Sequence, residues 1–308
     1  MRKCCLFLAA VFLLCAWPLA AAEESITRIS SREEMEQVRL NPAGKYVLTA
    51  DIDFQGESWK PVLLSGTFDG GGHTISNIRF EADTEFLETT VDGNKKTYDT
   101  VCTGFFGALE GAAVSNLNLE NVTADLKLEG NVFLGGLAGW LDESTVENCS
   151  VKGEFKLLSK GQIAGVSGLV GYGNGTITGC STDVILTVGD AAEDISTEQF
   201  LGGILACGHA DINGCTVRLD ALSAVWGYCH DGGIVGMFAV LKKGAFRRYR
   251  VADSSVEGKI RFFEKGPSRR AYCKPFIGEQ LHEKVSVSRN KKIFEKEELK
   301  EYPELEIQ

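Results

Sequence analysis

The chain has 308 residues, of which 44% are hydrophobic and 24% charged, and its net charge is −10. This hydrophobic fraction excludes an intrinsically disordered chain, because such chains have too few apolar side chains to form a core. The acidic balance argues against nucleic acid as a general partner, since binding to phosphates needs a positive surface.

Residues 1–22 have the composition of a secretory signal peptide. Arg2 and Lys3 form a positive start, Cys4–Trp17 is apolar, and Ala20–Ala22 supplies small residues for cleavage. The apolar run is shorter than the ~20 residues of a spanning helix, which argues against a membrane anchor. We therefore expect an exported protein, secreted or associated with the cell surface, with no transmembrane segment after removal of the signal.

Residues 23–45 are predicted to form an N-terminal cap. Ser31 and Glu34 match a capping box, in which the serine caps a helix and the glutamate reaches back. The helix should end before Asn41 and Pro42. Such a helix would cover the first coil of a repeated β-structure, which otherwise presents an unpaired edge.

The segment FDGGGHTISNI, Phe68 to Ile78, places three glycines and His73 between apolar residues. We interpret it as a corner between two strands, because glycine reaches positive φ without a steric penalty. His73 is then a turn residue. Asp51 and Asp53 alternate on the preceding strand and are expected to be a solvated pair rather than a catalytic one.

Glycine-rich segments recur from residue 104 to residue 278. GFFG, GLAG, GLVG, GILA, GIVG and PFIG follow one another at spacings of 32, 32, 35, 30 and 42 residues. Four of them are followed by a second shared piece: AVSNLNL, TVENCSV, TITGCST and DINGCTV. Three apolar columns result: Ile75, Val114, Val146, Ile177 and Ile212; Ile78, Leu117, Cys149, Cys180 and Cys215; and Phe105, Leu137, Leu169, Ile204, Ile234 and Phe276.

Apolar columns of this kind are what a coil needs when each turn stacks on the previous one, about 4.8 Å away. The units contain short β-like runs without helical periodicity, which favours a β-helix over an α-solenoid or a propeller. We predict an all-β, right-handed single-stranded parallel β-helix of seven to eight coils over residues 46–264. The handedness follows the general rule for parallel crossovers. Residues 85–100 should project as a loop.

The segments GLAG, GLVG and GIVG, each followed by I/V-x-x-C, resemble the GLUG-motif repeats of bacterial surface proteins. The approach GKYVLTADIDF…ESWKPV…SGTFDGGGHTISNI is similar to the first coils of such β-helices, so the resemblance covers roughly residues 44–236. It implies a secreted or cell-surface β-helix. It implies no particular reaction, because these repeats occur as scaffolds and binding regions.

Seven cysteines follow the signal segment, which in an exported protein invites disulfide bonds. Their positions favour another interpretation: Cys149, Cys180 and Cys215 share a column with Ile78 and Leu117, so we expect structural core cysteines, mostly reduced. Zinc would suit thiolate and imidazole ligands. The candidates are Cys207, His209, Cys215, Cys229 and His230. Their spacing matches no compact zinc motif, so we predict no metal and no cofactor.

Residues 241–275 carry 11 basic and 3 acidic side chains, in contrast to the acidic remainder of the chain. Gathered on a projecting loop, seven of these cations would form a polyanion-binding site: Lys242, Lys243, Arg247, Arg248, Arg250, Arg269 and Arg270. The alternative is that they only balance the acidic body. Residues 265–308 are predicted to form the last coil and a charged C-terminal cap.

The sequence contains no serine-hydrolase, zinc-protease or catalytic-triad motif. We therefore expect a binding or interaction module without catalytic activity, adhesin-like or specific for a glycan or an anionic polymer. Its partner would be a glycan, a cell-wall polymer or a host or cell-surface ligand. The alternative is a carbohydrate-active hydrolase or lyase on a β-helix scaffold, which would require two converging carboxylates.

Overall fold

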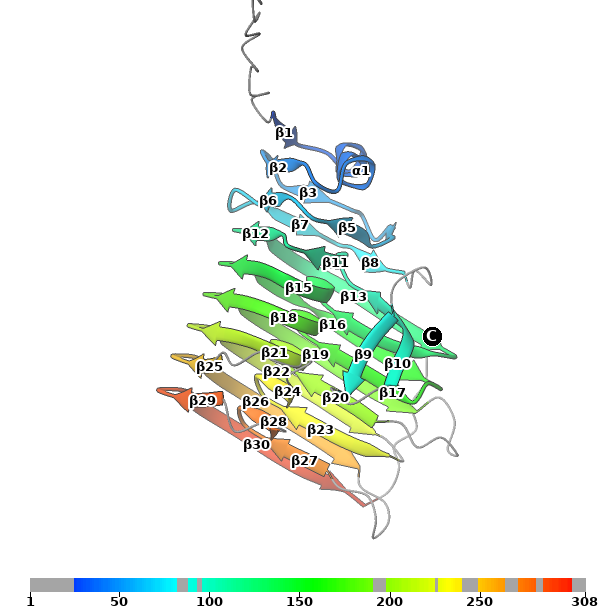
Figure 1. Ribbon diagram of the computed structural model, residues 1–308, viewed down its shortest axis with the longest axis vertical. Coiled ribbons are helices and arrows are strands. Elements are labelled where there is room, and N and C mark those ends of the chain that lie inside the picture. The colour runs from blue at the N-terminus through cyan, green and yellow to red at the C-terminus, as the bar shows by residue number, and fades with distance from the viewer. Residues whose placement is uncertain are drawn as a thin grey trace, which may run out of the picture.

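The computed structural model describes residues 25–81, 88–92, 96–190, 198–224, 227–239, 249–263, 271–280 and 285–300. Within these residues, strands stack one above another along the long axis, and one short helix, α1 (Arg32–Leu40), stands at the N-terminal end (Figure 1). The protein is an all-β parallel β-solenoid, which confirms the predicted fold class.

The described strands form three sheets. The first contains β1 (Ile26–Ile29), β2 (Lys45–Leu48), β5 (Val62–Leu64), β6 (Thr67–Asp69), β11 (Phe106–Glu110), β12 (Ala113–Ser115), β15 (Ala138–Glu147), β18 (Val170–Thr178), β21 (Leu205–Asn213), β24 (Val235–Phe238), β25 (Tyr249–Ala252), β28 (Ile277–Gln280) and β29 (Val285–Ser288). The second contains β3 (Ile52–Asp53), β4 (Ser58–Trp59), β7 (Thr74–Ser76), β8 (Arg79–Phe80), β13 (Asn118–Leu128), β16 (Ser150–Ser159), β19 (Ser181–Asp190), β22 (Thr216–Ala224), β26 (Ser255–Phe263) and β30 (Lys291–Leu299). The third contains β9 (Glu88–Asp92), β10 (Lys96–Thr103), β14 (Asn131–Gly135), β17 (Ile163–Ser167), β20 (Glu198–Gly202), β23 (Tyr228–Gly232) and β27 (Ala271–Lys274).

The predicted count of seven to eight coils was too high, since the solenoid has about five turns. Strands β1 to β8 have only two to four residues each and pair within the first and second sheets. The third sheet begins with β9 and β10, which pair antiparallel. The segment expected to project as a loop therefore contains two paired strands in its described part.

The apolar columns are confirmed from β12 onward. Val114 pairs with Val146, and the same register continues through Ile177 and Ile212. The register assigned to the first coil was wrong, because Val114 pairs with Phe68 rather than with Ile75. The segments around Phe68 and around Ile75 both alternate apolar and polar residues. Alternation alone therefore did not show which of the two continues the column of Val114.

The N-terminal helix caps the solenoid as predicted. Ser31 Oγ accepts a hydrogen bond from the backbone N–H of Glu34 at 3.3 Å. The Glu34 carboxylate reaches back one residue further than in a capping box and accepts from the backbone N–H of Ser30 at 2.7 Å. Met35 and Val38 are fully buried in the main core, so the helix closes this end with apolar contacts.

The first glycine of the repeated segments lies where successive turns approach each other closely. A Cβ atom at Gly203 would lie 2.3 Å from the carbonyl oxygen of Gly233 and 2.4 Å from Cγ1 of Val217. At Gly136, the corresponding atom would lie 2.3 Å from the carbonyl oxygen of Gly168. The motif is therefore a packing requirement of the stacked turns.

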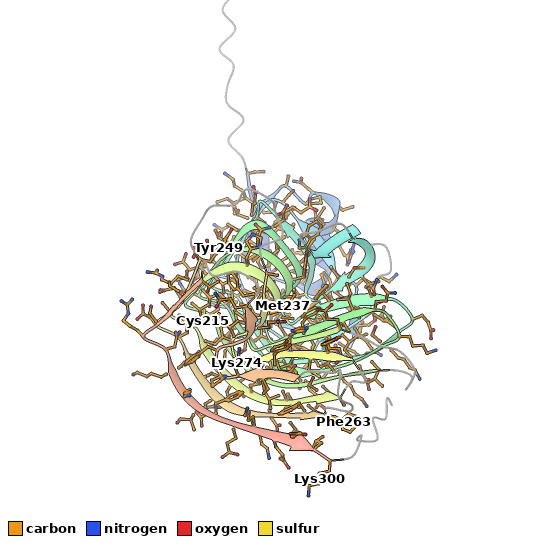
Figure 2. All side chains as sticks on the ribbon, turned by 60° about the horizontal axis from the view of Figure 1, so that its bottom comes forward. Cys215, Met237, Tyr249, Phe263, Lys274 and Lys300 are labelled. Atoms are coloured by element: carbon orange, nitrogen blue, oxygen red, sulfur yellow. The ribbon has the colours of Figure 1, made fainter. Side chains whose placement is uncertain are left out.

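Cys149, Cys180 and Cys215 lie in the main core, each 1% exposed, and are free thiols. Successive backbone hydrogen bonds, from Ser181 N–H to Cys149 and from Thr216 N–H to Cys180, place them on neighbouring turns. Figure 2 shows Cys215 among the strands, well inside the rim marked by Lys300. The three thiols fill a continuous column through the core.

We expect Cys180→Val to change the free energy of unfolding by no more than about 1–1.5 kcal/mol, because it conserves volume and polarity in a buried site. Cys180→Asp should unfold the local turns, since it places an unpaired charge in the core. Urea denaturation measures both effects. Thiol alkylation of the denatured protein followed by mass spectrometry should find free sulfurs; a bond between any two of these three cysteines would contradict the expectation.

Candidate functional site

The basic segment predicted to bind polyanions falls mainly outside the described residues. Lys242, Lys243, Arg247, Arg248, Arg269 and Arg270 all lie there. Arg250 is described: it is exposed on β25, and its backbone N–H donates to Asp211 Oδ1 at 3.0 Å. The polyanion site therefore stays a prediction.

The cysteines and histidines considered for zinc are not brought together. Cys229 belongs to the inward face of β23, whereas His230, the next residue, points to the opposite face. Cys215 lies in the core column, and His209 Nδ1 lies 3.1 Å from the carbonyl oxygen of Ala239. Across the described ranges, no group of three His, Cys, Asp or Glu side chains is arranged to hold a metal ion.

Asp51 and Asp53 are both exposed and support turns of the next coil. Asp51 Oδ1 accepts from the backbone N–H of Thr74 at 2.9 Å and lies 3.1 Å from His73 Nδ1. Asp53 Oδ1 accepts from the side-chain amide of Asn77 at 2.7 Å. These bonds lower the pKa of both carboxyls, with the backbone bond dominant for Asp51 and the Asn77 bond dominant for Asp53.

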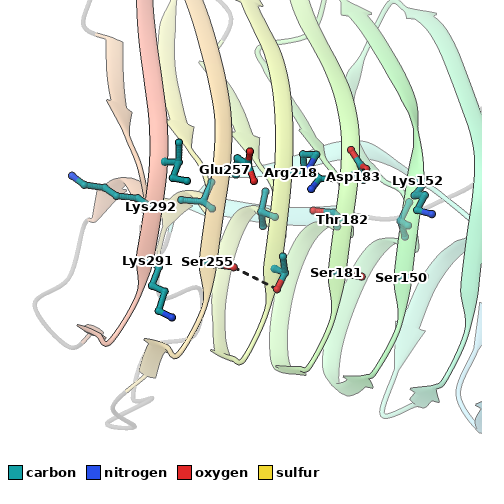
Figure 3. Close-up of a pocket in the computed structure, with 15 residues that line it drawn as sticks. Ser150, Lys152, Ser181, Thr182, Asp183, Arg218, Ser255, Glu257, Lys291 and Lys292 are labelled. Carbon is teal, nitrogen blue, oxygen red and sulfur yellow. Dashed lines mark hydrogen bonds and ion pairs between the residues drawn. The ribbon is translucent and has the colours of Figure 1, made fainter.

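A groove of about 570 Å³ crosses five neighbouring strands of the second sheet, β16, β19, β22, β26 and β30. We call it the axial groove, because it runs parallel to the solenoid axis (Figure 3). Strands lie about 4.8 Å apart, so five of them give a groove about 19 Å long. Fifteen residues line it in three rows set by the parallel register: the hydroxyl row Ser150, Ser181, Thr216, Ser255 and Lys291; the floor row Val151, Thr182, Val217, Val256 and Lys292; and the charged row Lys152, Asp183, Arg218, Glu257 and Ile293.

The hydroxyl row offers a line of donors and acceptors. Ser255 Oγ donates to Thr216 Oγ1 at 3.4 Å, the contact drawn in Figure 3. Ser150 Oγ donates to Asn118 Oδ1 at 2.7 Å, which ties the row to the preceding strand. Each hydroxyl can donate one hydrogen bond and accept two, so the row retains capacity for a ligand rich in hydroxyls.

The charged row alternates in sign along the groove. Lys152 Nζ lies 2.9 Å from Glu120 Oε1, and Arg218 Nη1 lies 3.2 Å from Asp183 Oδ2. All four side chains are at least partly exposed, so these pairs contribute little to stability. Because each charge lies beside an opposite one, the middle of the groove is close to neutral, with polar side chains along its two edges and a mainly apolar lining.

A second cluster of titratable side chains surrounds His230. Its Nε2 lies 3.1 Å from Glu198 Oε1 and its Nδ1 lies 2.6 Å from Glu279 Oε2. The rings of Phe200 and Tyr272 stack on its two faces, with centroids 5.1 and 5.4 Å away. Burial by itself lowers the pKa of His230, but the two carboxylates outweigh it and raise the pKa to about 9. The imidazole is buried, so this cluster links neighbouring turns of the solenoid and is not open to a ligand.

The next residue, Asp231, is fully buried in the main core. It pairs with Leu201 and Cys273 on the neighbouring strands. Within the described residues, neither carboxyl oxygen has a hydrogen-bond donor in good geometry. Burial raises the pKa of Asp231 to about 7, against smaller opposing effects of the Ser223 hydroxyl and of His230.

No protein-family model matches the chain, and no curated protein matches it in sequence. The resemblance to GLUG-motif repeats therefore rests only on the sequence motifs: the repeated glycine segments, the I/V-x-x-C pieces that follow them and the segment that precedes the first repeat. Of the part of the chain that the structure describes, no helix has both the length and the apolar composition to cross a membrane.

Sequence reasoning missed the axial groove, although a signal for it exists. The residue after each column cysteine is Ser150, Ser181 or Thr216, so the hydroxyl row repeats with the core column. The charged row appears two residues later, at Lys152 and its equivalents. The spacing of the two rows shows that both face outward, but it does not show the hollow between them.

Proposed function

We propose that the protein is an exported binding module that holds an extended glycan in the axial groove. The observation that carries the proposal is a straight groove that crosses five strands, with a hydroxyl-bearing row along most of its length, a charged row on its other side and a mainly apolar lining. A polymer laid along the axis meets a similar set of groups at every turn. A repeating chain of sugars suits such a surface, because its hydroxyls recur along its length and can both donate and accept hydrogen bonds.

The setting of the proposal is a bacterial cell surface, secreted or retained there, with an adhesin-like role. It is supported by the signal-like composition of residues 1–22 and by the resemblance of the GLAG, GLVG and GIVG segments to GLUG-motif repeats. The groove supports binding rather than catalysis because its middle is neutralised by the Arg218–Asp183 pair.

The second candidate is a glycan-cleaving enzyme, favoured by the two carboxylates in the charged row. Asp183 and Glu257 lie two strands apart, which separates their main chains by about 10 Å. Carboxyl groups about 6.5–9.5 Å apart serve inverting glycosidases. If this candidate holds, incubation with a bound oligosaccharide will release shorter products, and Asp183→Asn will abolish their release without preventing binding.

The proposal is tested with a glycan array and a pair of groove variants. Ser181→Leu combined with Thr216→Leu should weaken retention of the selected glycan at least 10-fold, because it removes two hydroxyls and narrows the groove. The matched control is Thr145→Leu combined with Thr176→Leu, on the neighbouring strands β15 and β18 of the first sheet.

Thr145 and Thr176 match Thr216 and Ser181 in exposure, since each pair has one exposed and one partly buried side chain. The control pair lies on another face of the solenoid. Circular dichroism checks that both variants fold. Equal binding by the two double variants, or retention of no glycan by the wild-type protein, would contradict the proposed function.

A further inference from the structure

The last turn of the solenoid ends in open strand edges. β30 has nine residues and pairs with β26 on one side. Among the described strands it stands last in the second sheet, so the main-chain groups of its other edge have no neighbouring strand there. The opposite end of the molecule differs, because α1 covers the first turn (Figure 1). A long open edge of this kind can pair with a strand of another molecule.

The row of side chains that faces the core changes from apolar to charged at this edge. On β26 the row consists of buried apolar side chains: Val256, Ile260 and Phe262. In the parallel register the residues that follow them on β30 are charged and exposed: Lys292, Lys296 and Glu298. This end therefore suits a partner that brings opposite charges better than an apolar cap such as α1.

The charges on β30 are separated by sign along the strand. Lys291 and Lys292 give its start a net charge of +2, whereas residues 295–298, three glutamates and one lysine, have a net charge of −2. Lysines alone on an edge commonly keep it from pairing. Two halves of opposite sign act differently, because unlike charges opposite each other stabilise a strand pair and like charges destabilise it. The edge repels a parallel copy of itself in register and attracts an antiparallel one.

We propose that two copies of the chain join at this end by antiparallel pairing of their β30 strands. With Glu295 opposite its own equivalent, Lys292 of each copy faces Glu298 of the other, and Phe294 faces Lys296. This register keeps both core-facing rows on one side of the joined sheet, because residues an even number apart share a face. The two glutamates at the centre lie on the outer face, where water and salt screen their repulsion.

The main-chain hydrogen bonds supply most of the attraction between the two strands. A nine-residue antiparallel pair forms roughly eight such bonds. The two Lys292–Glu298 pairs contribute less to affinity, since ion pairs near the surface are weak. Their main effect is to select the antiparallel direction and the register.

The pairing places two axial grooves on one face of the dimer. Its twofold axis is perpendicular to the second sheet, so the outer surfaces of both copies point the same way. This consequence, unlike the dimer itself, rests on the proposed function. A glycan-covered surface would then be held at two sites at once, which raises the overall affinity without any new contact.

The test measures self-association of the purified protein by sedimentation velocity, from micromolar to submillimolar concentrations. The wild-type chain should form a dimer as the concentration rises. Lys292→Glu alone, or Glu298→Lys alone, should weaken the dimer at least about 10-fold, because each places like charges opposite each other twice. The matched controls are Lys127→Glu on β13 and Glu154→Lys on β16, which make the same charge changes at exposed positions away from this end. Both controls should dimerise like the wild type.

The two single variants give a sharper test when they are combined. In a mixture of Lys292→Glu and Glu298→Lys chains, each contact joins a glutamate to a lysine, so a mixed dimer should form with nearly wild-type affinity. Both exchanges in one chain should restore the dimer as well. Circular dichroism checks that every variant folds.

A wild-type protein that stays monomeric at every concentration overturns the inference. So does a dimer that the single variants leave intact, or one that neither the mixture nor the double exchange restores. Amide hydrogen exchange examines the edge itself: the β30 amides should gain protection on dimerisation, and equal protection in a monomer would mean that another part of this chain covers the edge. Glycan retention measured below the dimerisation range tests the axial groove separately.

Discussion

Asp231→Leu should make the protein more stable at pH 8, by about 2–4 kcal/mol in the free energy of unfolding, and should change it little at pH 4. Asp231 occupies a column whose preceding members are Leu134, Val166 and Leu201, so a leucine side chain suits the site. Equilibrium urea unfolding across this pH range measures the effect.

The direction follows from the pKa of the buried carboxyl. Burial raises the pKa of Asp231 from 3.8 to about 7, so the folded protein holds this proton more tightly than the unfolded chain does. The contribution of Asp231 to stability is therefore highest below pH 4 and falls as the pH rises towards 7. A shift of this size corresponds to about 4 kcal/mol.

Asp231→Asn provides the matched control, because it keeps the shape of the side chain and removes its charge. The difference in stability from wild type should depend on pH in the same way for both variants, since both remove the group that titrates. A stability difference between wild type and either variant that stays constant from pH 4 to pH 8 would show that Asp231 does not titrate in this range.

Gly203→Ala should lower the free energy of unfolding by at least about 3 kcal/mol. This is at the upper end of the effects of adding a single methyl group to a packed core. The new Cβ would lie 2.3 Å from the carbonyl oxygen of Gly233, a main-chain atom that cannot move without shifting the next turn. Gly130→Ala is the matched control, because no atom lies within 4 Å of a Cβ at that position. Removing glycine flexibility there should be neutral or slightly stabilising.

The midpoints of urea unfolding compare the two alanine variants directly. If Gly203→Ala and Gly130→Ala have similar midpoints, the close approach of successive turns at the glycine segments does not limit packing. The explanation of the repeated motif as a steric requirement would then be wrong.

The fold was predictable from the sequence because the solenoid repeats its inward-facing residues with its turns. Val146 and Ile177 are in register, and Cys149 and Cys180 lie in the same core, as the columns required. The residue before each cysteine also repeats for a physical reason. Asn148 and Gly179 adopt positive φ at the corner, 53° and 66°, a conformation that asparagine and glycine tolerate best.

The register of the first coil was not predictable in the same way. Phe68 and Ile75 both begin alternating segments, and only the pairing of β6 and β7 with later strands shows which segment continues which column. The predicted number of turns was too high for a related reason. The glycine spacing does not show that strands β1 to β8 are short and do not belong to the third sheet.

The groove and the buried charge were partly visible in the sequence. Asp231 stands five residues before Gly236, the same offset as Leu201 before Ala206, so an acidic residue in an apolar column could have been noticed. The pairing of His230 with Glu198 and Glu279 could not have been predicted from the sequence. These residues come from three turns, so the distances between them depend on how the turns stack. The hollow between the hydroxyl and charged rows depends likewise on the path of the main chain.

The most direct test of the glycan-binding proposal is a crystal structure of the protein with the oligosaccharide that the array selects. We expect the oligosaccharide to lie along the axial groove, with its sugars beside Ser181, Thr216 and Ser255 and its long direction parallel to the solenoid axis. An oligosaccharide bound on the first or third sheet, with the axial groove occupied only by solvent, would contradict the proposed function.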